Sequence, residues 1–368
     1  MKFRCDVKQL LEAVQTVIRV MPVRTPMEIL QGILLDADEN GLNVTASDGN
    51  MTTICFVPAE IETDGSVVLP GRLLSEVVRK LPADQMEASL NNRFVLNIRC
   101  GGSRFNISGR NAEEFPLPEQ IGYTYDIELP QPMLREMVHM IAFSVPQEDQ
   151  RVVLTGGFLN LYNGNIDMVG LDGFRMALKR VQISDTNTSA KAIIPCKALD
   201  EIEKLMGDDE NEKALLSFSQ NRLRLECGSA KFYTSLIEGE YIDYNRVIPK
   251  AFTLSATVET STFADCIERA ALIARSSRNN LIRLEVGNGA IIFSASSEAG
   301  DVQEEMPAEI QGEDLTISFN VRYLSELAHI LTADEIVLKF GSSVSPCVIM
   351  PVDSDEFVYL ILPVRTNA

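Results

Sequence analysis

Few residues of this 368-residue chain have the type and spacing needed for covalent chemistry. The two histidines, His139 and His329, both lie in segments with helical periodicity, where a helix-surface position is a simpler interpretation than a general base. Asp48 and Asp172 could offer carboxylates to a metal, but each precedes a glycine between two strand-like segments, which is first the pattern of a turn. No P-loop, GxSxG, HExxH or GxGxxG motif occurs. The sequence argues against an enzyme; the catalytic alternative, phosphoryl transfer, would require a bound divalent ion.

The cysteines give no sign of a reactive or metal-binding site either. Seven occur singly, with no CxxC pair and only two histidines to join them. We expect no metal site and buried, reduced thiols at all of them: Cys5, Cys55, Cys100, Cys196, Cys227, Cys266 and Cys347.

A positively charged residue recurs within a repeated stretch. Residues 66–84, 191–209 and 316–334 align without a gap at a spacing of 125, and each reads as a strand running into an amphipathic helix. A cation in the first turn of a helix is unfavourable for the helix dipole, so helix stability alone would not select it. Two interpretations remain open: a cation presented to a polyanion, or a surface side chain inherited through duplication. The cations are Arg72, Lys197 and Arg322.

Further positions of this stretch are equivalent. A glutamate follows each cation by four residues: Glu76, Glu201 and Glu326. A proline or asparagine precedes each helix and an aspartate follows it: Pro70, Pro195 and Asn320, then Asp84, Asp209 and Asp334. A period of this length is about the size of a domain. We therefore expect three tandem domains, residues 1–122, 123–250 and 251–368.

Hydrophobic periodicity predicts two β-α-β-β-β units in each repeat. In the first repeat, helices are expected over residues 7–20, with Asp6 as N-cap, and over residues 72–81. Turn residues separate strands expected over residues 29–36, 42–47 and 52–57. Later segments follow the same order, with helices over 132–143 and 262–275, a strand over 153–160 and a polar connector over 238–250. Antiparallel strands with one helix laid over each unit make an α+β fold, with helices on one side and sheets on the other.

Composition narrows the possible functions. Hydrophobic residues make up 45% of the chain, enough for several cores, and no apolar run of about 18 residues could cross a bilayer. The first 20 residues do not read as a leader, so we expect a cytoplasmic protein without membrane contact. A net charge of −19 argues against a general nucleic-acid binder, unless the basic residues gather on one surface.

Several segments of the chain are distinctive when taken together with the triple repeat: MKFRCDVKQLLEAVQTV at the start, SRFNIS at 103–108, DGFRMAL at 172–178, EGEYIDYNRVIPK at 238–250, FNVRYL at 319–324 and YLILPVR at 359–365. With these segments the chain resembles, over essentially all 368 residues, the bacterial sliding clamp family, the beta subunit of DNA polymerase III. The resemblance implies a DNA clamp fold in which two chains join head to tail as a ring, with helices inside and sheets outside. It further implies a non-catalytic processivity factor, with no cofactor, that encircles duplex DNA.

The resemblance also implies partners and contact residues. The partners are the replicative DNA polymerase, a clamp loader, and other polymerases and repair proteins that bind through short linear peptides. The residues expected to face DNA are Arg24, Arg72, Lys197 and Arg322. The residues expected at the dimer interface are Arg104 and Phe105 of one chain and Leu272, Ile273, Glu298 and Glu304 of the other. An apolar centre flanked by opposite charges suits such a pairing. The alternative is that Phe105, Leu272 and Ile273 are ordinary core residues.

A peptide-binding pocket is implied between the second and third domains. Its expected lining is Arg151, Leu154, Leu171, Gly173, Phe174, Arg175, Met176, Arg246, Val247, Asn320, Tyr323, Val344, Pro346, Leu360, Ile361, Leu362, Pro363, Val364 and Arg365. The leucines, Met176 and Val247 would make an apolar cleft with an arginine rim, which suits a peptide with one or two apolar anchors. The alternative is that residues 358–362 form only a final core strand and that Met176 is only a core residue. Both can hold, because a strand has two faces.

Some residues depart from the family pattern. Many members carry histidine where Phe174 stands and proline where Ile242 stands, and most end near the arginine that matches Arg365. Here the chain continues with Thr366, Asn367 and Ala368. These differences leave the preferred peptide open. A clamp-like adaptor or a duplicate clamp, rather than the main replicative copy, is a second alternative that the sequence does not separate.

Overall fold

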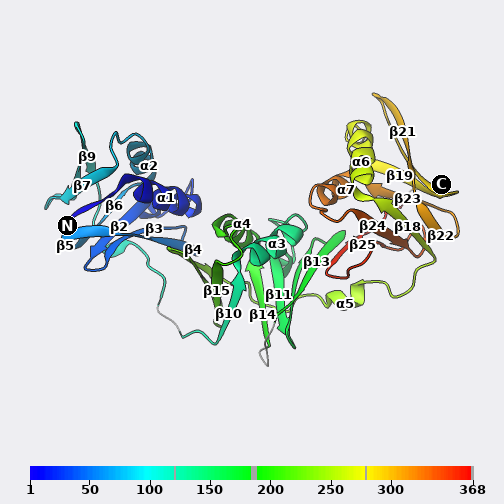
Figure 1. Ribbon diagram of the computed structural model, residues 1–368, viewed down its shortest axis with the longest axis horizontal. Helices are drawn as coiled ribbons and strands as arrows, with labels where there is room; N and C mark the ends of the chain where they lie inside the picture. Colours follow the sequence, from blue (N-terminus) through cyan, green and yellow to red (C-terminus); the bar gives the residue numbers. More distant parts are fainter. Residues whose placement is uncertain (120–121, 184–188, 278–279, 366–368) are drawn as a thin grey trace. The chain divides into compact units, whose positions relative to one another are not determined.

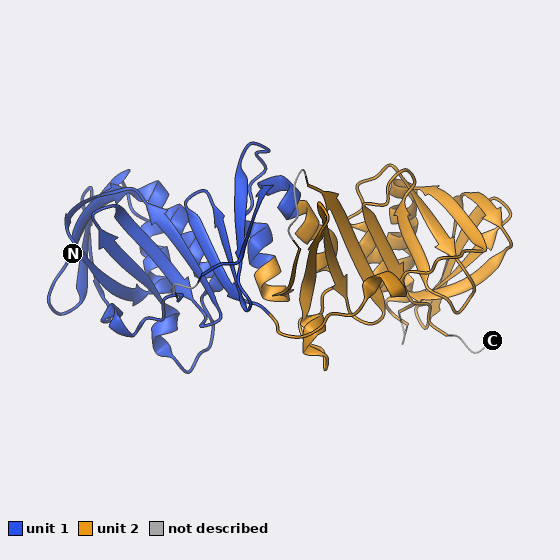
Figure 2. Ribbon diagram, turned by 90° about the horizontal axis from the view of Figure 1, so that it is seen from below, with its two compact units in different colours: residues 1–135, 200–236 blue, residues 136–199, 237–368 orange. Residues whose placement is uncertain are grey.

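The computed structural model describes residues 1–119, 122–183, 189–277 and 280–365. The chain divides into two compact units, one of residues 1–135 with 200–236 and the other of residues 136–199 with 237–368 (Figure 2). The first is called unit 1 and the second unit 2. Each unit contains its own pair of antiparallel sheets. The additional tail residues Thr366, Asn367 and Ala368 lie outside the described residues.

The described residues form seven α-helices, labelled in Figure 1: α1 Val7–Val17, α2 Gly71–Arg79, α3 Gln131–Ala142, α4 Cys196–Leu205, α5 Tyr244–Val247, α6 Thr260–Ala274 and α7 Val321–Ala328. Asp6 caps α1, as expected, by accepting a hydrogen bond from the Gln9 amide at 3.0 Å. The apolar face of α1 is buried against β3 and β4, and α1 lies beside α2, as α6 lies beside α7 (Figure 1).

Unit 1 contains a five-stranded sheet, β5-β1-β7-β8-β9, and an eight-stranded sheet, β10-β15-β16-β17-β4-β3-β2-β6. Their strands are β1 Lys2–Asp6, β2 Gly32–Asp38, β3 Gly41–Ser47, β4 Met51–Val57, β5 Ala59–Thr63, β6 Gly65–Pro70, β7 Gln85–Leu90, β8 Val95–Cys100, β9 Ser103–Ser108, β10 Tyr125–Pro130, β15 Lys213–Phe218, β16 Arg222–Cys227 and β17 Ala230–Ser235.

Unit 2 contains a nine-stranded sheet, β14-β11-β12-β13-β26-β25-β24-β18-β22, and a four-stranded sheet, β21-β20-β19-β23. Their strands are β11 Gly156–Tyr162, β12 Asn165–Leu171, β13 Arg175–Gln182, β14 Ala190–Pro195, β18 Leu254–Glu259, β19 Leu281–Gly287, β20 Ala290–Ser297, β21 Gly300–Pro307, β22 Glu309–Gly312, β23 Leu315–Asn320, β24 Glu335–Phe340, β25 Cys347–Pro351 and β26 Phe357–Ile361.

The two β-α-β-β-β halves of each repeat exchange their first strands. In the first repeat, β1 pairs with β7 of the second half, placing Phe3 opposite Ala88. In return, β6 pairs with β2 of the first half, placing Leu69 opposite Ile33. The strand before each helix therefore belongs to the sheet of the other half. The same exchange recurs as β10 with β15 and β14 with β11, and as β18 with β24 and β23 with β19.

The sheets also continue from one repeat into the next. In unit 1, β4 of the first repeat pairs with β17 of the second, with Cys55 opposite Ala230. In unit 2, β13 of the second repeat pairs with β26 of the third, with Met176 opposite Leu360. Each junction is thus a hydrogen-bonded ladder, and the second repeat is shared between the two compact units.

Several elements differ from the sequence expectation. The helix expected over residues 7–20 ends at Val17 and continues as a 3-10 helix, Ile18–Val20. Two expected strands begin later than predicted, because Glu28–Gln31 and Val152–Thr155 form 3-10 helices that feed β2 and β11. The short edge strands β5 and β22 and the helix α5 inside the polar connector were not predicted. Both edge strands are short and rich in exposed polar side chains, so each offers only one or two apolar residues to a pattern search.

Candidate functional site

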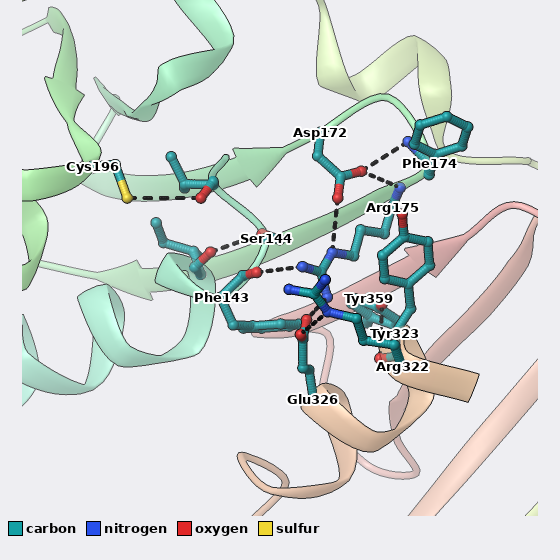
Figure 3. A network of polar contacts seen from close by, with 12 residues as sticks. Phe143, Ser144, Asp172, Phe174, Arg175, Cys196, Arg322, Tyr323, Glu326 and Tyr359 are labelled. Carbon is teal, nitrogen blue, oxygen red and sulfur yellow. Dashed lines mark hydrogen bonds and ion pairs between the residues drawn. The ribbon is translucent and has the colours of Figure 1, made fainter. Parts of the chain in front are cut away.

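The guanidinium group of Arg175 lies at the centre of a polar network in unit 2 (Figure 3). Arg175 opens β13, and only 7% of it is exposed. Its Nε donates to Asp172 Oδ2 at 3.0 Å, one terminal nitrogen donates to the Phe143 carbonyl oxygen at 2.6 Å, and the other pairs with the carboxylate of Glu326. A buried guanidinium with this many acceptors is compensated for its lost hydration.

Aromatic rings pack around the same guanidinium. The Arg175 Cζ atom lies 4.5 Å from the centroid of the Tyr323 ring and 5.2 Å from that of Phe143. The Phe143 ring in turn contacts Tyr359, whose hydroxyl donates to the Tyr323 carbonyl oxygen at 3.2 Å. Burial would lower the pKa of Arg175, but Tyr359, Glu326 and Asp172 outweigh it and raise that pKa. The group therefore stays charged, which favours its contacts with the ring faces.

The turn before β13 presents an exposed phenylalanine. Asp172 Oδ1 accepts hydrogen bonds from the Phe174 and Arg175 amides at 2.8 and 3.0 Å, and Gly173 adopts a φ of +90°. The Asp48-Gly49 turn is built in the same way, with Asp48 Oδ1 bound to two backbone amides. Both aspartates thus serve as turn residues, as the sequence pattern indicates. The turn leaves Phe174 61% exposed, with its ring 6.5 Å from that of Tyr323 and nearly parallel to it.

Glu326, on α7, binds two arginines at once. One carboxylate oxygen pairs with Arg175, and the other accepts a hydrogen bond from Arg322 Nε at 2.8 Å. Arg322 is one of the cations expected to face DNA, whereas Arg175 belongs to the expected peptide pocket. Glu326 therefore joins the two predicted groups, and it was not among the predicted site residues. Its recurrence at the position of Glu201 was the signal that could have drawn attention to it.

Exposed apolar side chains lie beside this network. Leu362 directly follows β26, and its amide donates to the Phe174 carbonyl oxygen at 2.8 Å. Continuing the register of β25 with β26 by one residue places Pro346 opposite Leu362. Val344, in the loop that leads to Pro346, is 60% exposed. Phe174 and Leu362 thus form an exposed apolar patch next to the buried Arg175.

The other residues expected to line the pocket fall into two groups. Five of them belong to one hydrophobic cluster, in which the partly buried Val247 packs against buried side chains: Leu154, Leu171, Met176 and Leu360. Ile242, noted as a family departure, packs against the same cluster. Ile361 is also buried, while Asn320, Pro346, Pro363 and Val364 are partly buried and Arg365 is exposed. The structure therefore brings most of the predicted apolar residues together, many of them as core.

Two exposed arginines of the expected pocket are held by acidic neighbours. The Nε of Arg151 lies 3.2 Å from Asp149, and the Nε of Arg246 lies 2.9 Å from Asp243. A β-carbon added at Gly173 would lie 2.8 Å from a terminal nitrogen of Arg151, so Arg151 also adjoins the Phe174 turn. A ligand can draw these arginines away from their acidic neighbours with little loss of free energy, because exposed ion pairs contribute little stability.

The cations expected to face DNA are all exposed: Arg24, Arg72, Lys197 and Arg322. The glutamates at the equivalent helical position differ in their contacts. Glu201 is buried and pairs with Arg19 Nε at 3.2 Å and with Lys204 Nζ at 3.3 Å, whereas Glu76 is exposed. At both internal junctions, therefore, this glutamate receives an arginine from the preceding repeat: Arg19 in unit 1 and Arg175 in unit 2.

The residues expected at the dimer interface lie at or near two sheet edges. Arg104 and Phe105 are on β9, the last strand of its sheet in unit 1. Glu304 is on β21, the last strand of its sheet in unit 2, where it pairs with Arg269 at 2.8 Å, and Glu298 is exposed just before that strand. At the C-terminal end of α6, Leu272 is 72% exposed and Ile273 is partly buried. Leu272 is thus a surface residue, not a core residue.

The described part of the chain shows no grouping of three or more His, Cys, Asp or Glu side chains suited to a metal ion. All seven cysteines are buried thiols outside any disulfide, as expected. His139 is exposed on α3, and His329, beside the last turn of α7, is exposed with its Nδ1 3.7 Å from Glu268. None of the helices in the described ranges is long and apolar enough to cross a membrane.

Comparisons with known proteins assign the chain to a family. Three segments match the N-terminal, central and C-terminal domains of the DNA polymerase III beta subunit, over residues 1–119, 128–243 and 245–365. The chain belongs to the DNA polymerase III beta subunit family. The beta sliding clamp of Staphylococcus epidermidis is 32% identical over 359 residues, which cover 95% of each protein.

Solved structures agree with this assignment. The DNA polymerase sliding clamp of Bacillus subtilis superposes over the full length of both chains with a TM-score of 0.96 and 32% identity. A sliding clamp of Pseudomonas aeruginosa, solved bound to griselimycin, superposes over the full length of both chains with a TM-score of 0.94 and 25% identity. The chain thus has the α+β DNA clamp fold and acts as a non-catalytic sliding clamp.

Proposed function

We propose that two copies of this chain close head to tail into a ring around duplex DNA, with helices inside and sheets outside. The sliding clamp assignment supports a homodimer, contact with DNA and a polymerase partner. The ring then holds the replicative polymerase near its template. It slides with the polymerase because its link to DNA is topological.

The observation that carries ring closure is the pattern of sheet edges. At the junction between the first and second repeats, β4 pairs with β17, and at the next junction β13 pairs with β26. The equivalent strands at the two chain ends are β9 and β21, which are edge strands in the described structure. Unpaired edges of this kind invite pairing with another chain. A β9–β21 contact between copies would repeat the internal junctions and close the ring.

Side chains at these ends complement one another. Arg104 and Phe105 on β9 would meet Leu272 and Ile273 of α6 and an acidic segment that contains Glu298 and Glu304. Opposite charges around an apolar centre favour this head-to-tail contact over head-to-head contacts. We also propose domain boundaries at residues 1–122, 123–250 and 251–368, which the repeat period supports.

Contact with DNA is proposed to be weak and directed to phosphate. Arg24, Arg72, Lys197 and Arg322 are exposed and can approach the duplex. Near them stand acidic side chains such as Glu76, so the surface is not uniformly basic. Such a surface suits sliding, because tight phosphate contacts would hold the ring at one place.

The patch around Phe174 is proposed as the docking site for short linear peptides. An exposed aromatic ring over a buried, rigid network gives an apolar anchor point, and Arg151, Arg246 and Arg365 provide a basic rim. The full proposed set is the nineteen pocket residues named from the sequence. Proposed partners at this site are the replicative polymerase, the clamp loader, other polymerases and repair proteins, all in the cytoplasm. Griselimycin, which a related clamp binds, is a proposed ligand of the same site.

Retention on DNA tests the ring. The protein is incubated with nicked circular DNA, its cognate clamp loader and ATP, washed at high salt, and the DNA is then linearised. Electrostatic binding weakens steeply with salt, whereas a threaded ring stays on the circle and slides off the linear form. Loss of the protein during the wash, with a loader shown to be active on a related clamp, would contradict encirclement.

A further inference from the structure

Two arginines with different proposed roles share the carboxylate of Glu326 (Figure 3). Arg322 is 70% exposed and belongs to the cations proposed to meet DNA. Arg175 is buried and holds the turn that presents Phe174. We propose that Glu326 couples the two surfaces, so that DNA in the ring strengthens peptide binding. This inference rests on the proposed DNA-facing and peptide-binding roles.

The two halves of this arrangement differ in how firmly they are held. The Arg322–Glu326 pair is an exposed i,i+4 pair, a kind that contributes little stability and is screened by salt. A DNA phosphate can therefore draw Arg322 away from Glu326. The Arg175–Glu326 pair is shielded, because the Arg175 side chain is only 7% exposed. It remains when Arg322 leaves.

When Arg322 leaves Glu326, more of the negative charge of the Glu326 carboxylate is available to Arg175. While both arginines are bound, one carboxylate charge is divided between two guanidinium groups. Once Arg322 binds phosphate, that charge acts on Arg175 alone, and attraction between charges is stronger in a poorly hydrated site. The expected result is a firmer hold of Arg175 on the Phe143 carbonyl oxygen and the Tyr323 ring.

Arg175 transmits this to the peptide-binding patch. Its Nε binds Asp172, whose other oxygen fixes the Phe174 amide, and the Phe174 ring stacks on the Tyr323 ring that also covers Arg175. A firmer Arg175 leaves Phe174 less freedom before a ligand arrives. A ligand then loses less entropy on binding, so its affinity rises. Glu326 is thus a positioning residue, which acts on the ligand through Arg175.

The size of the effect is limited by the weaker pair. Because a ligand shifts an equilibrium only by its differential affinity, and exposed pairs are worth little, DNA should tighten ligand binding by only about two- to fivefold. Replacing Glu326 should have a larger effect, since it leaves Arg175 buried without one of its charged partners. We expect Glu326→Gln to weaken ligand binding by about tenfold.

The first experiment measures binding of fluorescein-labelled griselimycin to the free protein by fluorescence anisotropy. Wild type, Glu326→Gln and Glu76→Gln are compared, the last altering the equivalent exposed glutamate of α2. Equal dissociation constants for wild type and Glu326→Gln would overturn the positioning role. Weaker binding to Glu326→Gln alone supports it, provided that thermal unfolding shows the variant to be folded.

The second experiment measures the same dissociation constants for clamps loaded on nicked circular DNA and washed free of loader. Wild type should bind the probe more tightly on DNA than off it, while Arg322→Ala, an exposed substitution that leaves the fold intact, should bind equally in both states. An unchanged constant in wild type, or a difference that persists in Arg322→Ala, would overturn the coupling. Failure of the proposed function gives a different result: either free wild type does not bind the probe, or the clamp is not retained on the circle. Either result would overturn the coupling as well.

Discussion

The carboxylate of Asp167 is completely buried and accepts two hydrogen bonds from the guanidinium of Arg180, at 2.7 and 2.9 Å. It also accepts from the hydroxyls of Tyr162 at 3.0 Å and Tyr244 at 2.7 Å. Tyr244 opens α5, the helix inside the connector that carries Arg246 and Val247. A fully satisfied buried carboxylate in β12 thus fastens the connector to the sheet of unit 2.

Removing the Tyr244 hydroxyl should loosen the connector. We expect Tyr244→Phe to lower the free energy of unfolding by roughly 1.5–3 kcal/mol, because a buried carboxylate loses a hydrogen bond. The first thermal transition should fall by several degrees, and calorimetry measures it. Tyr233→Phe is the matched control, since no hydrogen bond of its hydroxyl is found among the described residues. Equal transitions for the two variants would contradict the anchoring role.

Phe174 is expected to dominate ligand binding at the proposed site. Exposed aromatic anchors that become buried in a complex often contribute about 2 kcal/mol or more. Phe174→Ala should therefore raise the dissociation constant for griselimycin by about thirtyfold, measured by fluorescence anisotropy. Leu117→Ala, which trims another exposed apolar side chain, in unit 1, should leave it unchanged. An unchanged constant for Phe174→Ala would place the ligand elsewhere.

Leu272 should be needed for the dimer. Because 72% of Leu272 is exposed, packing within a single chain does not explain why an apolar residue stands at this position. A charge buried in an apolar interface is strongly unfavourable, so Leu272→Glu should convert the dimer to a monomer at micromolar concentration. Sedimentation velocity measures this, and Val352→Glu, another exposed apolar position in unit 2, is the control. Persistence of the Leu272→Glu dimer would exclude Leu272 from the interface.

Alkaline pH should destabilise the fold through its buried thiols. Burial raises the pKa of Cys5 and Cys55 to about 12 and that of Cys227 to about 11. Because these values exceed the unfolded pKa of about 8.5, the folded state keeps thiol protons that the unfolded state has lost. The stability that they contribute is therefore complete below about pH 8.5 and is lost progressively as pH rises through the folded pKa.

The melting temperature of wild type should consequently fall between about pH 9 and pH 11. Each thiol lowers the free energy of unfolding by up to about 1.4 kcal/mol per pH unit in this range. A variant with Cys55→Ala and Cys227→Ala should start from a lower melting temperature but lose less of it over this range. Differential scanning calorimetry across the pH series tests the slope. Parallel profiles for the two proteins would contradict a contribution from these two thiols.

Local features of the chain were predictable because they depend on nearby residues. The cap at Asp6, the turns at Asp48 and Asp172 and the helical stretches follow from spacing and from short-range hydrogen bonds. The strand exchange between halves did not follow, because periodicity shows which face of a strand is buried but not which strand it pairs with. Arg175 and Glu326 are 151 positions apart, so only the fold reveals their contact.

The candidate site was predictable only in part for the same reason. The resemblance named Phe174, Arg175 and Tyr323 as site residues but gave no role to Phe143 or to Tyr359, although Tyr359 begins one of the matching segments. The Arg175 guanidinium lies over the Phe143 ring, and that ring contacts Tyr359. A phenylalanine or tyrosine in an apolar segment reads first as core, and both rings do pack inside unit 2. Their contribution lies in what they contact, which composition and spacing do not encode.

The cations proposed to face DNA should affect movement along DNA rather than retention on it. We expect a variant with Arg24→Ala, Arg72→Ala and Lys197→Ala to stay on nicked circles through a high-salt wash, because a closed ring needs no ionic contact to remain threaded. On stretched duplex it should diffuse faster than wild type and respond less to salt, since each phosphate contact adds about 0.9 to the salt exponent. Single-molecule tracking measures both quantities.

A variant with Arg93→Ala and Arg99→Ala, exposed cations outside the proposed set, is the control. Equal diffusion of wild type and the triple variant at every salt concentration would remove these residues from the DNA contact.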